Sequence, residues 1–208
     1  MKTHPFLLAL GAGLTLLAAQ PAAAQNALTL YGGYRGGGSF NQSNSDGTDT
    51  TANLASSGVG ALSFDWPIDA ARNGQIFASG QRTPVQLAPS STGAPTSLPL
   101  KIGYLHLGGS NFIDGQAGQG AYVAGGLGAT FMTPQQSGYS SEVRPSMSLA
   151  LGYEQPLGSA VSLRMELRGY ATLINSSGGF FCSGGCVVVL HGDGLLQAEG
   201  LIGLSLRF

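Results

Sequence analysis

A strict two-residue alternation of apolar and polar side chains dominates the sequence after about residue 27, while helical periodicity is weak. The clearest case is residues 161–173, VSLRMELRGYATL, where one face carries aliphatic side chains and the other carries polar and charged ones. This period is the signature of a β-strand whose two faces meet different surroundings. The alternation therefore predicts an all-β fold.

Segments of this kind recur along the chain, and most reach the length of a tilted strand that crosses a bilayer, about 9–11 residues. An even number of antiparallel strands can close without an unpaired edge, which a lipid environment requires. We therefore predict an eight-stranded antiparallel up-and-down transmembrane β-barrel. The predicted strands are residues 27–38, 53–66, 75–86, 98–109, 120–132, 145–155, 160–174 and 195–208. The register of the fourth is ambiguous, because it has large apolar residues on both faces.

The first residues have the pattern of a secretory signal peptide. Lys2 supplies a positive charge, an apolar stretch follows over residues 6–19, and small residues precede Gln25. We predict a signal peptide at residues 1–24 and a single barrel domain at residues 25–208. Only 9% of the residues are charged, against about 25% in an ordinary soluble domain, and this also favours a membrane environment.

The connections differ in length in a way that predicts orientation. The connections at residues 39–52, 87–97, 133–144 and 175–194 are long and polar, whereas the others are short. Transmembrane barrels have long outer loops and short periplasmic turns. The predicted location is the bacterial outer membrane, with the loops outside and both termini in the periplasm.

A signal peptide, eight alternating strands and a terminal Phe208 together resemble the small outer-membrane β-barrels of Gram-negative bacteria in the OmpA/OmpX-like superfamily. The segment LRGYATLINSSGGFFCSGGC, followed by a last strand ending in SLRF, also resembles a proteobacterial group of outer-membrane β-barrel proteins. The resemblance implies the fold and the location, and it makes Phe208 part of the signal for the barrel-assembly machinery. It implies no established activity.

The polar face of the strands carries charges that a narrow barrel must neutralise, because an unpaired buried charge is very costly. The predicted interior charge network comprises Arg35, Asp65, Glu154, Arg164, Glu166, Arg168 and Glu199. The favoured interpretation is an ion-paired plug that closes the barrel, and the alternative is a narrow ion or water path. A soluble barrel with an apolar interior is the structural rival. It would turn its apolar face inward and these charges outward, toward the solvent.

The other face is predicted to contact lipid. Leu54 is assigned to this face, and aromatic side chains are expected at the membrane interfaces. These outward aromatic candidates are Phe64, Trp66, Tyr104, Phe131, Tyr153 and Phe208.

Catalysis is not expected. His106 is interpreted as structural, and a grouping of Ser183, His191 and Asp193 is a weak match to a hydrolase or acyltransferase site. The chain has too few basic residues for nucleic-acid binding, and no cofactor is predicted. The predicted function is structural or surface-interacting, as a monomer, with outer-membrane lipids and lipopolysaccharide as partners. The extracellular ligand stays open, and the alternatives are a pore or a lipid-modifying enzyme.

Cys182 and Cys186 are the only cysteines, and SGG separates them. Export through an oxidising compartment favours a disulfide between them, which would staple the tip of the last loop. A zinc site with His191 and Asp193 is a second possibility, but thiolate ligands must be reduced. Free or redox-active thiols are the third.

Overall fold

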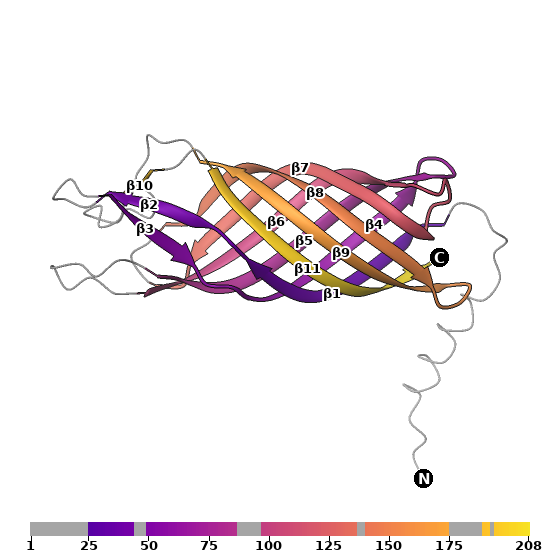
Figure 1. The fold of residues 1–208 in the computed structure, drawn as a ribbon, viewed down its shortest axis with the longest axis horizontal. Coiled ribbons are helices and arrows are strands. Elements are labelled where there is room, and N and C mark those ends of the chain that lie inside the picture. Colours follow the sequence, from indigo (N-terminus) through magenta and orange to yellow (C-terminus); the bar gives the residue numbers. More distant parts are fainter. Residues whose placement is uncertain (1–24, 44–48, 87–96, 137–139, 175–188, 192–193) are drawn as a thin grey trace, which may run out of the picture.

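The computed structural model describes residues 25–43, 49–86, 97–136, 140–174, 189–191 and 194–208. The predicted signal peptide lies outside them. Eight long strands pair antiparallel in the order β1-β4-β5-β6-β7-β8-β9-β11, and β11 pairs with β1 to close a barrel (Figure 1). The predicted fold class is confirmed. The eight strands are β1 (Ala27–Gly36), β4 (Ser57–Pro67), β5 (Arg72–Gln86), β6 (Ser97–Phe112), β7 (Gly120–Pro134), β8 (Glu142–Pro156), β9 (Val161–Leu173) and β11 (Gly194–Arg207).

The two ends of the barrel differ. At one end, which we call the short-turn end, residues 68–71, 113–119 and 157–160 join neighbouring strands, and β1 begins beside the end of β11. At the other end, the long-loop end, the short strands β2 (Ser39–Ser43), β3 (Asp49–Leu54) and β10 (Val189–His191) extend beyond the barrel (Figure 1). Parts of the segments 39–52 and 175–194, which were predicted as loops, are therefore strands. No helix among the described residues is long and apolar enough to cross a membrane.

The predicted strand 53–66 is interrupted, and this corrects the orientation of Leu54. Ala55 and Ser56 separate β3 from β4, so the alternation restarts after them. Leu54 pairs with Val85 and is only 6% exposed, inside the barrel rather than on its wall. The buried positions change from even-numbered at Leu54 to odd-numbered at Val59 and Ala61, so the alternation is out of phase across the break. The sequence pattern alone did not reveal this change.

The ambiguous register of β6 is settled by its pairing with β5 and β7. Even-numbered side chains between Leu100 and Phe112, including Ile102, Tyr104 and His106, are buried in the lumen. Lys101 is exposed on the wall. The prediction that Tyr104 faces the membrane was therefore wrong. The strand carries large apolar residues on both faces, so periodicity could not separate them.

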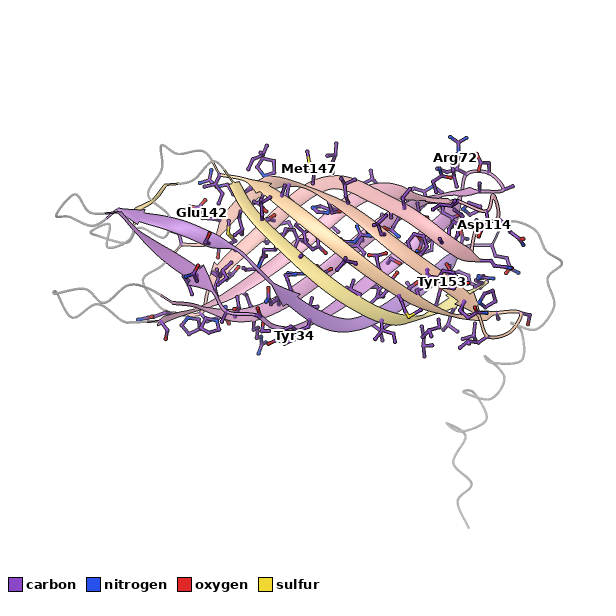
Figure 2. The ribbon with its side chains drawn as sticks, viewed as in Figure 1. Tyr34, Arg72, Asp114, Glu142, Met147 and Tyr153 are labelled. Carbon is purple, nitrogen blue, oxygen red and sulfur yellow. The ribbon has the colours of Figure 1, made fainter. Side chains whose placement is uncertain are left out.

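The outer wall is apolar around the whole barrel. Large hydrophobic side chains are exposed on every long strand, among them Leu30, Leu149 and Leu196 at 69–74%. Tyr34, Met147 and Tyr153 are labelled on the wall in Figure 2, and all three are exposed. They are part of a continuous outward face that suits lipid rather than water.

Outward-facing aromatic side chains gather near the short-turn end of β4. The rings of Phe64 and Trp66 stack with centroids 6.2 Å apart. The indole of Trp66 covers Gly74 on β5, where an added Cβ would lie 2.2 Å from it. Tyr153 and Phe208 are exposed on the wall, as is Phe131 on β7.

Glycine is required where a strand approaches its neighbour closely, and Gly128 on β7 is such a position. A Cβ added there would lie 1.9 Å from the carbonyl oxygen of Leu105, whereas a Cβ added to Gly60 would meet nothing within 4 Å. Gly128→Val is expected to lower the free energy of unfolding by about 1–3 kcal/mol through overpacking, and Gly60→Val to leave it nearly unchanged. Urea unfolding followed by the fluorescence of Trp66, the only tryptophan, measures both. Equal midpoints would contradict the assignment.

Candidate functional site

The lumen is the candidate functional site, because it gathers the chemistry-bearing side chains of the barrel. The structure places all seven charged residues of the predicted interior network there, and each is at most 4% exposed. They project from β1, β4, β8, β9 and β11 at alternating positions. Arg207, at the end of β11, joins them, and we call these eight residues the lumen network.

Arg164 organises the part of the lumen network nearest the short-turn end. Its Nη1 donates to Asp65 Oδ2 at 2.8 Å, and its Nε lies 3.5 Å from Glu154 Oε2. Glu154 also accepts from Arg207 Nη2 at 2.8 Å. Because Arg207 Nη2 also donates to the carbonyl oxygen of Gly118, the network ties the β6–β7 turn across the mouth of the barrel.

A second cluster lies in the middle of the lumen. Arg168 Nε donates to Glu166 Oε1 at 2.7 Å, and Tyr122 donates to Glu166 Oε2 at 2.8 Å. Gln75 connects the two clusters, since its amide nitrogen donates to Asp65 at 2.8 Å and its oxygen accepts from Arg168 at 3.0 Å.

The third cluster combines an ion pair with stacked rings. Arg35 and Glu199 approach within 2.6 Å, and the Tyr170 hydroxyl also donates to Glu199. The rings of Tyr170 and Tyr104 stack with centroids 3.9 Å apart. The Arg35 guanidinium lies 4.8 Å from the Tyr104 centroid, so the cation also contacts an aromatic face.

His106 occupies the space beside the small residues of β7. Its two ring nitrogens lie 2.9 Å from the hydroxyls of Ser146 and Ser148, and a Cβ added to Gly128 would be 2.7 Å from its ring. Ser148 also accepts a hydrogen bond from Arg168 at 3.0 Å. Hydroxyl groups of β8 therefore hold the imidazole in place, and the ring fills the space that the small residues of β7 leave. No local sequence pattern indicated the Ser–His contacts, because they join different strands.

The lumen network is electrically balanced. Four arginines face four carboxylates, and each of these residues takes part in at least one ion pair. Such pairing offsets the large cost of removing the charges from water. Nη2 of Arg164 is a buried donor for which the described residues supply no partner. Arg164 lines a cavity of about 450 Å³ at the short-turn mouth, together with Asp65, Glu154 and Arg207.

An apolar layer closes the other end of the lumen, and the sequence analysis missed it. Its side chains come from the ends of the strands next to the long loops, they contact one another, and none is more than 6% exposed. Its members are Leu54, Val85, Leu100, Ile102, Met132, Ile174 and Leu195. The inward positions of Leu100 and Ile102 were hidden by the ambiguous register of β6. The lumen is thus polar toward the short-turn end and apolar toward the long-loop end.

Several predicted residues lie elsewhere. Phe208 is exposed on the wall, and its N–H donates to the Asn26 carbonyl oxygen at 3.0 Å. His191 lies on β10 opposite Asn41. The remaining loop residues, Cys182, Ser183, Cys186 and Asp193, fall outside the described residues, so the predicted disulfide and its alternatives stay predictions. Within the described part of the chain, no group of three or more His, Cys, Asp or Glu side chains is arranged to hold a metal.

At the short-turn rim, Asp69 and Arg72 form an exposed ion pair at 2.5 Å. The hydrogen bond from the Arg72 side chain, reinforced by the backbone N–H groups of Ala71 and Arg72, lowers the pKa of Asp69. This pair contrasts with the lumen network, because both of its members remain in contact with solvent.

A closed barrel with ion-paired charges inside and an apolar wall outside is the reverse of a soluble ligand-binding barrel. It is the arrangement of a transmembrane β-barrel of the outer-membrane type. The soluble rival is therefore excluded by the side-chain orientation.

Solved structures of outer-membrane proteins share this fold. Neisserial surface protein A superimposes with a TM-score of 0.56 at 13% identity, covering 91% of this chain and 100% of that chain. OprG from Pseudomonas aeruginosa gives 0.54 at 14% identity, covering 89% and 97%. AlkL, determined in lipid bilayers, gives 0.54 at 14%, covering 91% and 94%. No protein-family model and no curated protein sequence matches the chain. The chain thus has the fold of the small eight-stranded, OmpA/OmpX-like outer-membrane barrels.

Removing Arg164 tests whether the lumen network stabilises the fold. Arg164→Met leaves Asp65 without its ion-pair partner and removes one partner of Glu154, so we expect the free energy of unfolding to fall by about 3–5 kcal/mol. The double variant Asp65→Leu/Arg164→Met should recover part of this loss. Arg72→Met breaks an exposed pair and should leave the urea midpoint unchanged. Equal shifts for the two single variants would contradict a stabilising network.

Proposed function

We propose that this protein is a closed barrel of the bacterial outer membrane with a structural or surface-interaction role. The observation that carries the proposal is the double closure of the lumen, by the lumen network toward the short-turn end and by the apolar layer toward the long-loop end. The apolar wall and the fold shared with outer-membrane proteins support the location.

The apolar layer favours the closed barrel over the pore alternative. An ion that entered from the short-turn mouth would first have to displace Arg164 and Arg168 from their carboxylate partners. It would then meet the packed side chains of the apolar layer, none of them more than 6% exposed, and apolar constrictions exclude water and ions.

The proposal includes an orientation and a set of partners, and the difference between the two ends supports the orientation. The long-loop end faces the outside, where its loops contact surface ligands, and both termini of the mature chain face the periplasm. Membrane lipids and lipopolysaccharide surround the wall of a monomeric barrel, and the assembly machinery reads Phe208 during insertion. A non-catalytic role is part of this proposal, and the mutual ion pairing of the charged side chains in the lumen supports it. The disulfide between Cys182 and Cys186 is part of this proposal.

Planar-bilayer recording tests the closed lumen. The refolded protein is expected to show no steady conductance, since either closure alone obstructs the path. Met132→Ser should remain silent because the lumen network still blocks the other half. A steady wild-type conductance that falls when Glu166→Gln is introduced would overturn the proposal in favour of a pore.

Cysteine labelling on intact cells tests the orientation. In a Cys182→Ser/Cys186→Ser background, Gln136→Cys places a thiol near the long-loop end and Gln116→Cys places one in a short turn; both positions are exposed. A membrane-impermeant maleimide should label the first in intact cells and both after permeabilisation. Labelling of only the second in intact cells would reverse the orientation, and recovery of the protein as a soluble periplasmic species would overturn the location.

A further inference from the structure

Charges on the outer wall are few and one-sided. Among strand residues whose side chains are described, only Arg72, Arg82 and Lys101 carry charge on the outward face. Arg72 is paired with Asp69 at the short-turn rim. The other two lie toward the long-loop end, beyond outward residues of their strands that are apolar or glycine.

Arg82 and Lys101 are direct partners in the pairing of β5 with β6. Both are exposed, and no ion pair within the described part of the chain involves either one. Like charges directly opposite each other on neighbouring strands destabilise a sheet. An anion bound between the two cations would relieve this repulsion, and the described residues supply none.

A row of glycines adjoins the two cations on the same wall. Gly32, Gly60, Gly80 and Gly103 are successive pairing partners across β1, β4, β5 and β6. An added Cβ would meet nothing within 4 Å at the first three. Phe131, the partner of Gly103, stands at the β7 end of this row.

Two glycines of the row, Gly80 and Gly103, line a hollow in the wall beside the cations. It measures about 380 Å³, and its lining includes Gly58, Gly80, Arg82, Lys101 and Gly103. Gln81 and Ile102 also line it, but their side chains are buried on the lumen side. The other outward residues of the wall are mostly large and apolar. A ligand that fits must therefore combine an anionic group with an apolar body.

We propose that Arg82 and Lys101 bind the phosphate of an anionic membrane lipid and that the row of glycines seats its acyl chain. The Arg82 guanidinium supplies a fork of donors and the Lys101 ammonium a mobile point charge, a combination suited to phosphate. A membrane lipid is favoured over free phosphate because the hollow opens onto the apolar wall. This inference rests on the proposed membrane insertion.

Native mass spectrometry of the refolded mature chain tests the site. The probes are phosphatidylglycerol and phosphatidylcholine with identical acyl chains, so that only the headgroup charge differs. The wild type should retain phosphatidylglycerol about five- to tenfold more than phosphatidylcholine, a difference of about 1.0–1.4 kcal/mol. Arg82→Gln/Lys101→Gln should abolish the preference, whereas Arg72→Gln, which removes a wall cation outside the hollow, should keep it.

A second pair of variants separates a built site from general attraction. Gly80→Leu fills the hollow while keeping both cations, and it should lower phosphatidylglycerol retention at least threefold. Gly158→Leu is the matched control, because an added Cβ there also meets nothing within 4 Å, but in a short turn. Folding of every variant is checked by heat-modifiable gel mobility.

Three outcomes would overturn the lipid site: equal retention of the two lipids, equal losses for Arg72→Gln and the double variant, or displacement by equimolar inorganic phosphate. A different result would contradict the proposed function. If the wild type does not insert into phosphatidylcholine vesicles, the membrane barrel itself is wrong, whereas insertion without a headgroup preference removes only the lipid site.

Discussion

The pairing of β11 with β1 closes the sheet, and this closure decides where each kind of side chain lies. A closed sheet has no edge to hydrogen-bond with solvent, so its wall can be surrounded by hydrocarbon. Polar side chains of each strand then have only the lumen to occupy. The two-residue alternation is the direct consequence, because every strand must present one face to lipid and the other to the interior.

The interior must neutralise the charges that it buries, and it must also fill the part of the lumen that holds no charge. Charges inside a narrow barrel are costly unless they are paired, and the four arginines of the lumen network are matched by four carboxylates. Gln75 links two of its clusters, and stacked tyrosines flank the third. The apolar layer closes the remaining half of the lumen, and it brings no charge that would have to be neutralised. The barrel is thus held closed by electrostatic pairing in one half and by hydrophobic packing in the other.

The sequence predicted the closed eight-stranded architecture and the interior location of the charges because alternation reports the face of a residue directly. It failed where alternation was interrupted or where both faces were apolar. Leu54 was misplaced by the interruption at residues 55–56, and Tyr104 by the ambiguous strand that contains it. The same ambiguity concealed the apolar layer. Contacts such as those of His106 with Ser146 and Ser148 join different strands, so no local pattern encodes them.

Cations are paired differently in the lumen and on the outer wall. Inside, each cation of the lumen network has an acidic partner within the protein. On the wall, Arg72 also has its own acid, whereas Arg82 and Lys101 stand side by side without one in the described part of the chain. A barrel that neutralises its charges this consistently has no structural use for two opposed cations in an apolar wall. Their neutralisation is explained if the membrane supplies the anion, and the neighbouring glycines then have a reason to leave the wall bare.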